Sequence, residues 1–275
     1  MKVALTAIVK NENRYLREWI EYYKQLGIDH IYIGDNNDSD GEQLETVLYD
    51  YLELPNPYIT IVNVKNKKIY QRPLYEFVYN EYGYKYNWMC FFDIDEFLYL
   101  KEDKTIQDYL SRDIFNEAEQ IHINWLIYDD NNLIEYDDRP VQERFTRISE
   151  KVLLNNKLDY YINNNTVKSI MRTKLNVSIL NSATWKGNDN ELKTVNEYGG
   201  YNNETWTLSV PNYSLALIKH YPFKSLEEFL IKRYMKHSAE LETDQRDLSD
   251  FFRINKETKE KENFITKYFN EKPQS

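Results

Sequence analysis

Apolar and polar residues alternate along the first hundred positions in blocks that have the lengths of strands and helices. The aliphatic run over residues 2–9 predicts a buried strand. Apolar residues over 15–26 recur three and four positions apart, which predicts an amphipathic helix that ends at Gly27. A second apolar run over 30–33 leads into a polar loop over 34–41. This order of strand, helix, strand and loop is typical of a βαβ unit.

The same alternation continues to about residue 100, weakens, and becomes regular again near the C-terminus. The pattern predicts further strands over 58–62, 88–92, 120–127 and 215–218. It predicts helices over 42–51, 73–82, 105–110, 225–236, 248–254 and 257–269. We therefore expect one α/β domain built on a doubly wound, mostly parallel sheet flanked by helices. The last helices are expected to pack on this core, with dimerisation or docking at a membrane edge as alternatives.

Three polar loops follow predicted strands and would meet at one edge of such a sheet. They cover residues 10–12, 35–40 and 93–96. In open α/β sheets, ligands bind beyond the carboxyl ends of the strands. In the third loop, Asp93 and Asp95 stand one residue apart directly after an apolar strand. Two neighbouring carboxylates repel each other unless a cation lies between them, so this pair predicts a Mn²⁺ or Mg²⁺ site.

Composition narrows the classes of partner. The net charge is −10, so a broad electrostatic attraction to nucleic acid is not expected, and an anionic ligand would need local cations or a metal. The 25 tyrosines supply amphipathic rings of the kind on which sugars pack. The single cysteine, Cys90, excludes an internal disulfide and suits a reducing compartment. With no apolar run near the roughly 20 residues that span a bilayer, we expect a cytoplasmic protein with at most peripheral contact at the inner face of the membrane.

Several motifs together resemble glycosyltransferase family 92 and related bacterial enzymes of the glycosyltransferase 2-like superfamily. The metal motif is Asp93-Ile94-Asp95-Glu96-Phe97-Leu98. The other stretches that carry the resemblance are the opening strand and helix over 7–12 and 15–23, the loop over 35–40, and the later motifs over 167–172 and 219–230. The resemblance runs from residue 1 to about residue 236.

This resemblance implies a GT-A fold over residues 1–240, with a nucleotide-binding half over 1–100 and an acceptor half over 101–240. Residues 241–275 would then form a C-terminal helical extension. The resemblance also implies an inverting hexosyltransferase that uses a UDP-sugar, with galactose as the expected hexose. Its acceptor would be a glycan or glycolipid in the biosynthesis of surface polysaccharide or glycoprotein.

The resemblance also assigns residues to the donor site. It implies that Asp93, Asp95 and His220 hold Mn²⁺ or Mg²⁺. It implies that the nucleotide contacts the following residues, with the lysines 168 and 224 meeting phosphate oxygens: Ala7, Val9, Lys10, Glu12, Asp35, Asp93, Lys168 and Lys224.

An inverting transfer needs a general base that takes the proton of the acceptor hydroxyl. Asp and Glu are the residues expected in this role. The candidates are Glu96, Asp129, Asp130 and Glu143. We place Glu143 first and retain Asp130 as the second catalytic candidate.

Two other functions remain open from the sequence. The chain could be a non-catalytic carbohydrate-binding protein, in which aromatic rings stack on sugars and the acidic loop binds Ca²⁺. A nucleotidyltransferase is a weaker alternative, because the loop after the first strand, Lys10-Asn11-Glu12-Asn13-Arg14, lacks the glycines that such enzymes use around phosphates. The chain also lacks the motifs of P-loop kinases and of serine hydrolases.

Overall fold

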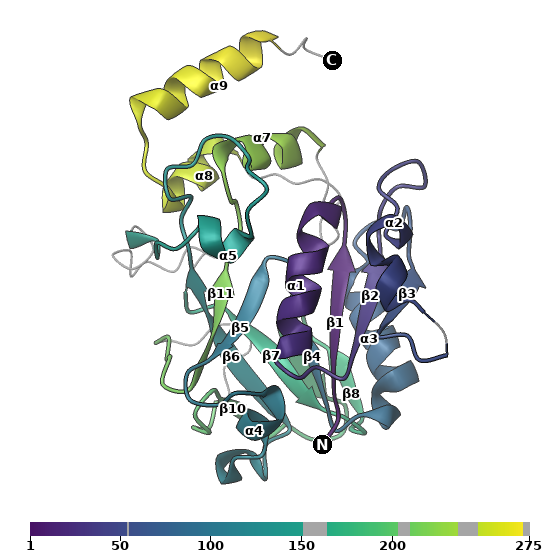
Figure 1. Cartoon of the computed structure of the whole chain (residues 1–275). Helices are drawn as coiled ribbons and strands as arrows, with labels where there is room; N and C mark the ends of the chain where they lie inside the picture. The colour runs from purple at the N-terminus through teal and green to yellow at the C-terminus, as the bar shows by residue number, and fades with distance from the viewer. Residues whose placement is uncertain (54, 151–163, 203–209, 236–246, 272–275) are drawn as a thin grey trace.

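The computed structural model describes residues 1–53, 55–150, 164–202, 210–235 and 247–271, and their strands form one large sheet (Figure 1). The described strands of this sheet number nine, and eight of them follow the order β3-β2-β1-β4-β7-β6-β11-β5, while β10 pairs with β6. The bounds are β1 Val3–Val9, β2 His30–Asp35, β3 Ile59–Asn63, β4 Trp88–Phe91, β5 Glu96–Leu100, β6 Gln120–Ile127, β7 Val167–Arg172, β10 Thr194–Asn196 and β11 Ala216–His220. A separate antiparallel pair consists of β8 Val177–Ile179 and β9 Trp185–Gly187.

Apart from the short α5, which was not predicted, the helices lie close to where the apolar spacing predicts them. Their bounds are α1 Asn13–Gln25, α2 Glu45–Leu48, α3 Gln71–Tyr82, α4 Ile106–Leu110, α5 Val141–Arg144, α7 Leu226–Met235, α8 Leu248–Ile254 and α9 Lys259–Glu271. Short 3₁₀ turns are η1 Tyr49–Tyr51, η2 Gly83–Lys85 and η3 Asp113–Phe115. The helix expected over 42–51 is therefore shorter, because α2 passes into η1 after one turn. Gly27 ends α1 with φ of 97°, a left-handed conformation that favours glycine.

The sheet is mixed, which corrects the expectation of a mostly parallel sheet. Strands β3, β2, β1 and β4 are parallel, in agreement with the βαβ pattern. Strand β7 then runs antiparallel to both β4 and β6, and β11 runs antiparallel to β5. Strand β7 follows β6 in the described sequence and returns beside it, whereas a parallel return would require a crossover on one face of the sheet. The α/β class is confirmed. The first half of the sheet is wholly parallel, and the second half combines the parallel pairs β6–β11 and β6–β10 with antiparallel ones.

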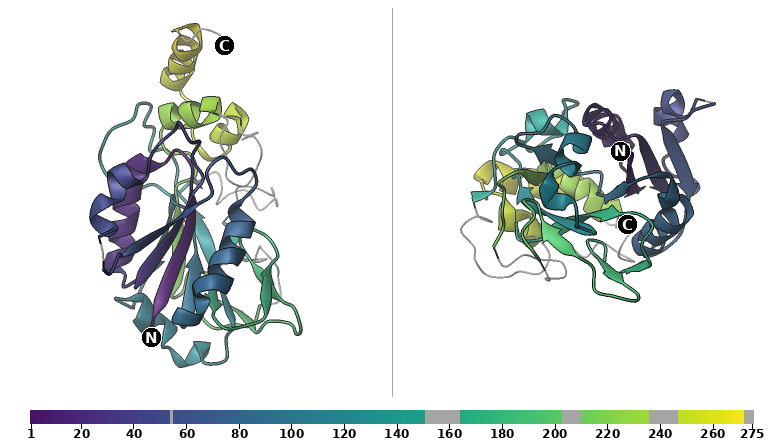
Figure 2. Two further views of the ribbon diagram at one scale, coloured as in Figure 1. Left: turned by 90° about the vertical axis from the view of Figure 1, so that its right-hand side faces the viewer. Right: turned by 90° about the horizontal axis from the view of Figure 1, so that it is seen from below.

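Two apolar layers cover the two faces of the sheet, and β1 contributes to both. Side chains alternate between the faces of a strand, so Leu5 joins the core beneath α1 and α2, whereas Ala4 joins the core beneath α3. Figure 2 shows α1 and α2 on one side of the parallel strands and α3 on the other. At Gly34 of β2, a Cβ atom would lie 2.2 Å from Leu74 Cδ2 of α3, so any larger residue there would displace the Leu74 side chain.

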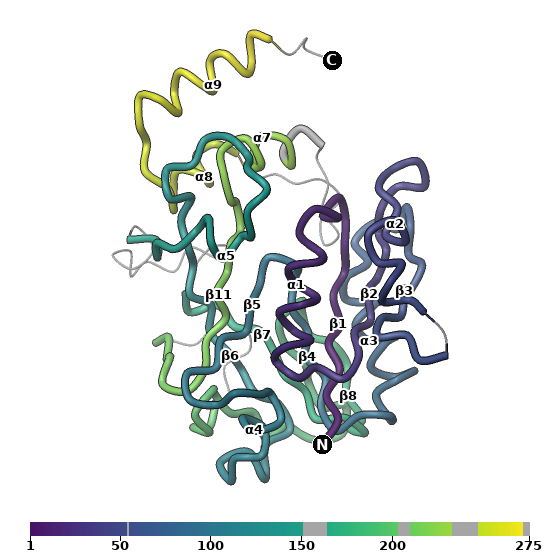
Figure 3. Tube along the Cα trace, viewed as in Figure 1, coloured from purple at the N-terminus to yellow at the C-terminus, as the bar shows by residue number. Residues whose placement is uncertain are grey.

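Helices α7 and α8 pack together at one end of the sheet. A third apolar cluster joins Phe229 of α7 to Phe251 and Ile254 of α8, as the packing expectation required. Helix α9 projects beyond this cluster (Figure 3), and its Lys261 forms a buried ion pair with Asp130. The boundary expected at residues 240 and 241 lies outside the described residues. Within the described ranges, no helix is both long enough and apolar enough to cross a bilayer.

Candidate functional site

The turn between β4 and β5 carries the acidic motif at the carboxyl edge of the sheet. The Asp93 backbone N–H donates to Glu96 Oε2 at 2.9 Å, which closes the turn. The indole Nε1 of Trp19 in α1 donates to the backbone carbonyls of Asp93 and Glu96, both at 3.0 Å. Because a buried helix residue holds both ends of the turn, the carboxylates have fixed positions.

The Asp93 carboxylate is held by three donors from α3 and β7. Gln71 Nε2 and the Tyr75 hydroxyl donate to Asp93 Oδ1 at 2.6 and 3.2 Å. Lys168 Nζ donates to Asp93 Oδ2 at 2.6 Å. Asp93 therefore has a partner on each oxygen. Gln71 and Tyr75, one helical turn apart at the start of α3, were not predicted from the sequence; their spacing of four is the signal that could have indicated them.

Lys168 lies beneath two acidic side chains and neutralises part of their charge. Its side chain is 3% exposed, and Nζ lies 3.4 Å from Glu96 Oε1 as well as against Asp93. Burial alone would lower the pKa of Lys168, but the Asp93 and Glu96 carboxylates outweigh it and raise that pKa well above its usual value. Lys168 therefore stays charged, and the structure places it as the counter-ion of the acidic turn.

Asp95, Glu96 and His220 form the group in the described chain that could hold a metal ion. One ligand atom from each lies within 4.8 Å of the others. His220 ends β11 and directs Nε2 toward Asp95 Oδ1 at 3.7 Å. His220 Nδ1 is buried and has no hydrogen-bond partner among the described residues, whereas Glu96 Oε1 makes no hydrogen bond but lies 3.4 Å from Lys168 Nζ. The three side chains therefore bring one imidazole nitrogen and two carboxylates together, which are donors that a divalent ion accepts.

The protonation states of Asp95 and His220 suit metal ligation at neutral pH. Burial would raise the pKa of Asp95, but His220, Lys224 and other nearby cations lower it to about 2. Burial lowers the pKa of His220 to about 4, so its imidazole is neutral. Burial raises the pKa of Glu96 well above its usual value, with Lys168 opposing this shift. An ionised carboxylate and a neutral imidazole are the ligand forms that a divalent cation requires.

A small pocket of about 80 Å³ lies between the start of α1 and the segment after β11. It brings together three of the residues predicted to contact the nucleotide, Lys10, Glu12 and Lys224. The other residues that line it are Asn11, Arg14, Tyr15, Glu42, Pro222, Phe223, Glu228, Ile231 and Lys232. Four cationic side chains line it against three carboxylates, and this small excess of positive charge suits an anionic group such as a phosphate.

Lys224 is the most constrained cation of this pocket. It is buried, has φ of 60°, and places Nζ 4.4 Å from the centre of the Tyr15 ring. Burial lowers the pKa of Lys224, and Asp95 opposes that shift. A left-handed backbone at a residue other than glycine or asparagine is uncommon and is maintained only by its surroundings.

A buried network fixes the surroundings of Lys224. Arg144 of α5 donates two hydrogen bonds to Glu228 of α7, at 2.8 and 3.1 Å. The Tyr15 hydroxyl donates to Glu228 Oε1 at 2.7 Å. This network links α1, α5 and α7 around the pocket, and sequence reasoning missed it because its members are up to 213 positions apart.

The second polar loop is joined to the first at the same edge. Asp35 Oδ1 accepts hydrogen bonds from the backbone and side chain of Asn37, and Oδ2 lies 3.3 Å from Lys65 Nζ. Asn37 Oδ1 accepts from the Asn11 backbone N–H at 2.7 Å. Lys10 Nζ lies 3.5 Å from Asp38. The predicted meeting of the loops after β1 and β2 is therefore confirmed.

The remaining predicted residues lie in different surroundings. Ala7 and Val9 are buried in β1, and the Val9 carbonyl accepts from the Asn36 backbone N–H. Glu143 is exposed on α5. Asp130 is buried and pairs with Lys261, and its backbone N–H donates a hydrogen bond to the Asn255 side-chain oxygen. The structure thus places Asp130 where it ties α8 and α9 to the segment after β6.

Comparison with known proteins adds a family likeness. The sequence profile of Glycosyltransferase family 92 matches residues 4–253. A protein of that family from Oryza sativa subsp. japonica is 29% identical over 120 residues, which are 39% of this chain and 18% of the relative. A family member from Arabidopsis thaliana is 26% identical over 113 residues, which are 38% of this chain. One from Ricinus communis is 24% identical over 117 residues, which are 39% of this chain. These matches span less than one fifth of the relatives' lengths, 17% and 19% in the last two.

Proposed function

The chain belongs to glycosyltransferase family 92, and from this premise we propose that it is a metal-dependent glycosyltransferase that uses a nucleotide-sugar donor. The observation that carries the proposal is the juxtaposition of Asp95 and His220 beside the cationic pocket around Lys224. A divalent ion and a diphosphate need these two features side by side. We infer a UDP-hexose as donor, with galactose as the first sugar to test.

Asp95 and His220 would hold Mn²⁺ or Mg²⁺ in this proposal. The fit rests on His220 Nε2, which lies 3.7 Å from Asp95 Oδ1, on the ionised Asp95 and on the oxygen and nitrogen donors that such ions accept. When bound, the ion would neutralise the charge that develops on the departing nucleoside diphosphate. Asp93 accepts from Gln71, Tyr75 and Lys168 while its side chain stays 33% exposed, so we assign it to positioning the acidic turn and to contact with the nucleotide.

The cations of the pocket would bind the diphosphate directly. Lys224 and Lys10 line the pocket, and the buried pair of Arg144 and Glu228 fixes the wall behind Tyr15. The loop that contains Asp35, Asn37 and Lys65 supplies donors and acceptors for the nucleoside. Lys168 keeps the acidic turn near neutrality, so the pocket attracts an anion in spite of the chain's net charge of −10.

We retain Glu143 as the proposed general base of an inverting transfer. Its exposed carboxylate on α5 is accessible to a glycan or glycolipid acceptor, whereas Asp130 is committed to Lys261. Inversion requires the acceptor hydroxyl to attack from the face of the sugar opposite the nucleotide, with Glu143 removing its proton.

The decisive experiment is a calorimetric titration with UDP, GDP and CDP, with and without Mn²⁺, on the wild-type protein and on Asp95→Asn. We expect UDP binding that depends on Mn²⁺ and is lost in Asp95→Asn. Tyr49→Ala, an exposed substitution on η1, is the matched control and should bind as the wild type does. Absence of nucleotide binding under every condition would overturn the transferase proposal and favour a non-catalytic carbohydrate-binding protein.

A further inference from the structure

A second and larger pocket lies at the opposite end of the sheet, at the amino end of β6. Its volume is about 310 Å³, at the lower end of the roughly 300–1,000 Å³ of small-molecule sites. Strand β6 is parallel to β4, because both are antiparallel to β7 between them. Its end at Ile127 therefore lies toward the edge of the candidate active site, and His122 lies five residues, or about 17 Å, back along the strand. The pocket is separate from the donor site.

The floor of this pocket is a buried and satisfied hydrogen-bond network around Gln120. Its Nε2 donates to Thr194 Oγ1 at 3.0 Å and to the Trp185 carbonyl at 3.3 Å. Its Oε1 accepts from Ser169 Oγ at 3.0 Å and from the Trp185 backbone N–H at 2.8 Å. Every hydrogen-bonding atom of the Gln120 amide group therefore has a partner, which makes the floor rigid before any ligand arrives.

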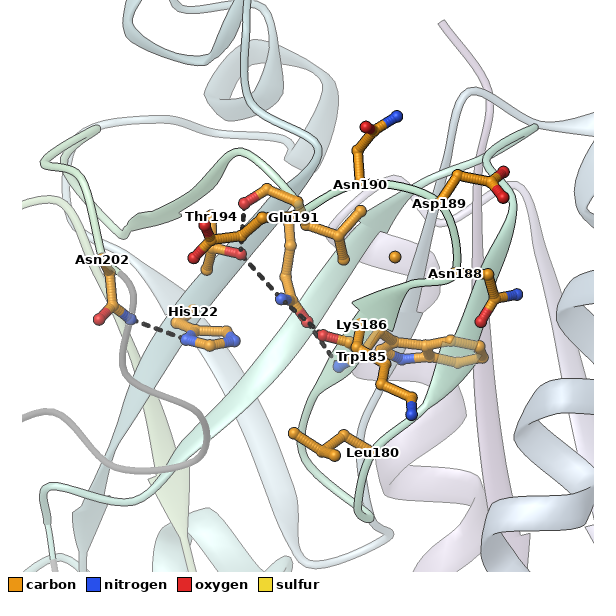
Figure 4. A pocket seen from close by; sticks show the side chains of 13 residues that line it. His122, Leu180, Trp185, Lys186, Asn188, Asp189, Asn190, Glu191, Thr194 and Asn202 are labelled. Carbon is orange, nitrogen blue, oxygen red and sulfur yellow. Dashed lines mark hydrogen bonds between the residues drawn. The ribbon is translucent and has the colours of Figure 1, made fainter.

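His122 is different, because one of its two ring nitrogens has no partner. Asn202 Nδ2 donates to His122 Nδ1 at 2.8 Å, so the proton of the neutral ring lies on Nε2. His122 is 1% exposed, and Nε2 makes no hydrogen bond among the described residues. Figure 4 shows the ring between Asn202 on one side and Leu180 and Trp185 on the other. An unsatisfied buried donor is costly, and a ligand oxygen in the pocket would satisfy it.

The rim is polar and has a defined shape. Asn176 Nδ2 donates to Asp189 at 2.7 Å, which fixes one side of the turn after β9. A Cβ atom at Gly187 would lie 1.8 Å from the Asn190 carbonyl oxygen, so the tight turn requires glycine. Two acidic side chains, Asp189 and Glu191, and one cation, Lys186, face this opening. This balance of charge disfavours an anionic ligand such as a nucleotide.

We propose that this pocket binds a neutral carbohydrate, with one sugar hydroxyl accepting the hydrogen bond of His122 Nε2. Amide and carboxylate groups at the rim supply the paired donors and acceptors that hydroxyl groups need, and the half-exposed Leu180 supplies an apolar contact. The site would anchor a glycan at a distance from the transfer reaction. It does not depend on the proposed donor site.

The test uses saturation-transfer NMR and calorimetric titration of the full chain with neutral trisaccharides of galactose, glucose or N-acetylglucosamine. A trisaccharide that contains glucuronic acid serves as the anionic probe. His122→Phe removes the donor and keeps a ring of similar size, and we expect about fivefold to tenfold weaker binding. Leu180→Trp places a large side chain at the rim, where Leu180 is 37% exposed, and should abolish binding without disturbing the core.

Two controls separate this site from the donor site. Tyr49→Ala should bind the trisaccharide as the wild type does, and so should Asp95→Asn, even though Asp95→Asn loses metal-dependent UDP binding. Loss of trisaccharide binding in Asp95→Asn together with retention in Leu180→Trp would place the sugar at the active edge and overturn the proposal. Failure of every neutral probe to bind the wild type, or preference for the anionic probe, would also overturn it.

Discussion

The parallel half of the sheet, β3-β2-β1-β4, and the mixed half, β7-β6-β11-β5, contribute to the candidate active site in different ways. In the parallel half, Asp35 ends β2, and Asp93 and Asp95 stand in the turn that follows β4. In the mixed half, Lys168 lies near the beginning of β7, whereas His220 lies at the end of β11. Strands β7 and β5 run in the opposite direction, so their first residues reach the edge that β1, β2, β4 and β11 reach with their last.

The two halves also differ in charge. The parallel half brings acidic side chains to the edge, and the mixed half brings the buried Lys168 and the neutral imidazole of His220. Each half depends on the other, because neighbouring carboxylates repel and a buried ammonium needs counter-ions. The site is therefore a charge-balanced interface between two halves of one sheet.

The largest effect is expected when one ligand is removed from either half. Asp95→Asn and His220→Gln should each lower kcat/KM by about a thousandfold, or about 4 kcal/mol, because each removes one ligand of the proposed metal site. The double variant should be little worse than either single variant, because the ligands act as a unit. Steady-state kinetics at saturating Mn²⁺ would check this; full additivity of the two losses would show that the halves act independently.

Glu143→Gln tests whether α5, which lies between β6 and β7 in the chain, supplies the general base. We expect kcat to fall by roughly 10²- to 10⁴-fold while the affinity for UDP stays unchanged, because the base contributes only to proton transfer. Asp130→Asn provides the contrast: it leaves Lys261 buried without its counter-ion and should lower the free energy of unfolding by about 3–5 kcal/mol. Unchanged kcat in Glu143→Gln would remove that residue from the mechanism.

Lys168→Met tests the charge balance directly. The substitution leaves Asp93 and the fully buried Glu96 without their cation, and we expect the free energy of unfolding to fall by about 3–5 kcal/mol. The loss should be smaller at pH 5 than at pH 8, since burial raises the pKa of Glu96 and a protonated Glu96 does not repel Asp93. Adding Glu96→Gln should restore part of the stability. Urea denaturation of the single and double variants measures both effects, and equal losses with and without Glu96→Gln would contradict the assigned role.

His122 gives the smallest effect and reports on the mixed half away from the active edge. Burial lowers its pKa from 6.5 to about 3, so the unfolded chain takes up a proton below pH 6.5 whereas the folded chain does not until about pH 3. The stabilising contribution of the neutral ring is present above pH 6.5 and is lost as the pH falls. Between pH 6.5 and 4.5 the wild type should lose about 2–3 kcal/mol relative to His122→Phe. Denaturation curves of both proteins at these two pH values measure the difference between their free energies of unfolding. A difference that does not change with pH would contradict the prediction.

Much of the parallel half could be predicted because its signals are local. The aliphatic run of β1, the helical spacing of α1 and the glycine at position 27 each fix structure within a few residues. The strands between β6 and β11 in the chain could not be ordered, since β8, β9 and β10 are three residues each and carry too little periodicity. The direction of β7 depends on which strand it joins, a choice made by long-range pairing.

In the candidate active site, too, some residues could be predicted from local motifs and others are placed there only by long-range contacts. Asp93, Asp95 and His220 stand in recognisable motifs, and the structure brings Asp95 and His220 together. Gln71, Tyr75 and the pair of Arg144 with Glu228 were not predicted, because nothing next to them in the chain indicates their partners. Lys168 was expected at a phosphate, and its position beneath Asp93 and Glu96 became visible only in the structure.

The sequence by itself determined the α/β class, the order of the first elements and the family, because periodicity and motifs act over short stretches of chain. Tertiary structure alone decided the mixed direction of the sheet and the burial of Lys168 beneath the acidic turn. It also decided the ion pair between Asp130 and Lys261 of α9 and the pocket beside His122. These features depend on contacts between residues tens to hundreds of positions apart, and whether a charged or polar group is paired, buried or open to a ligand is a property of such contacts.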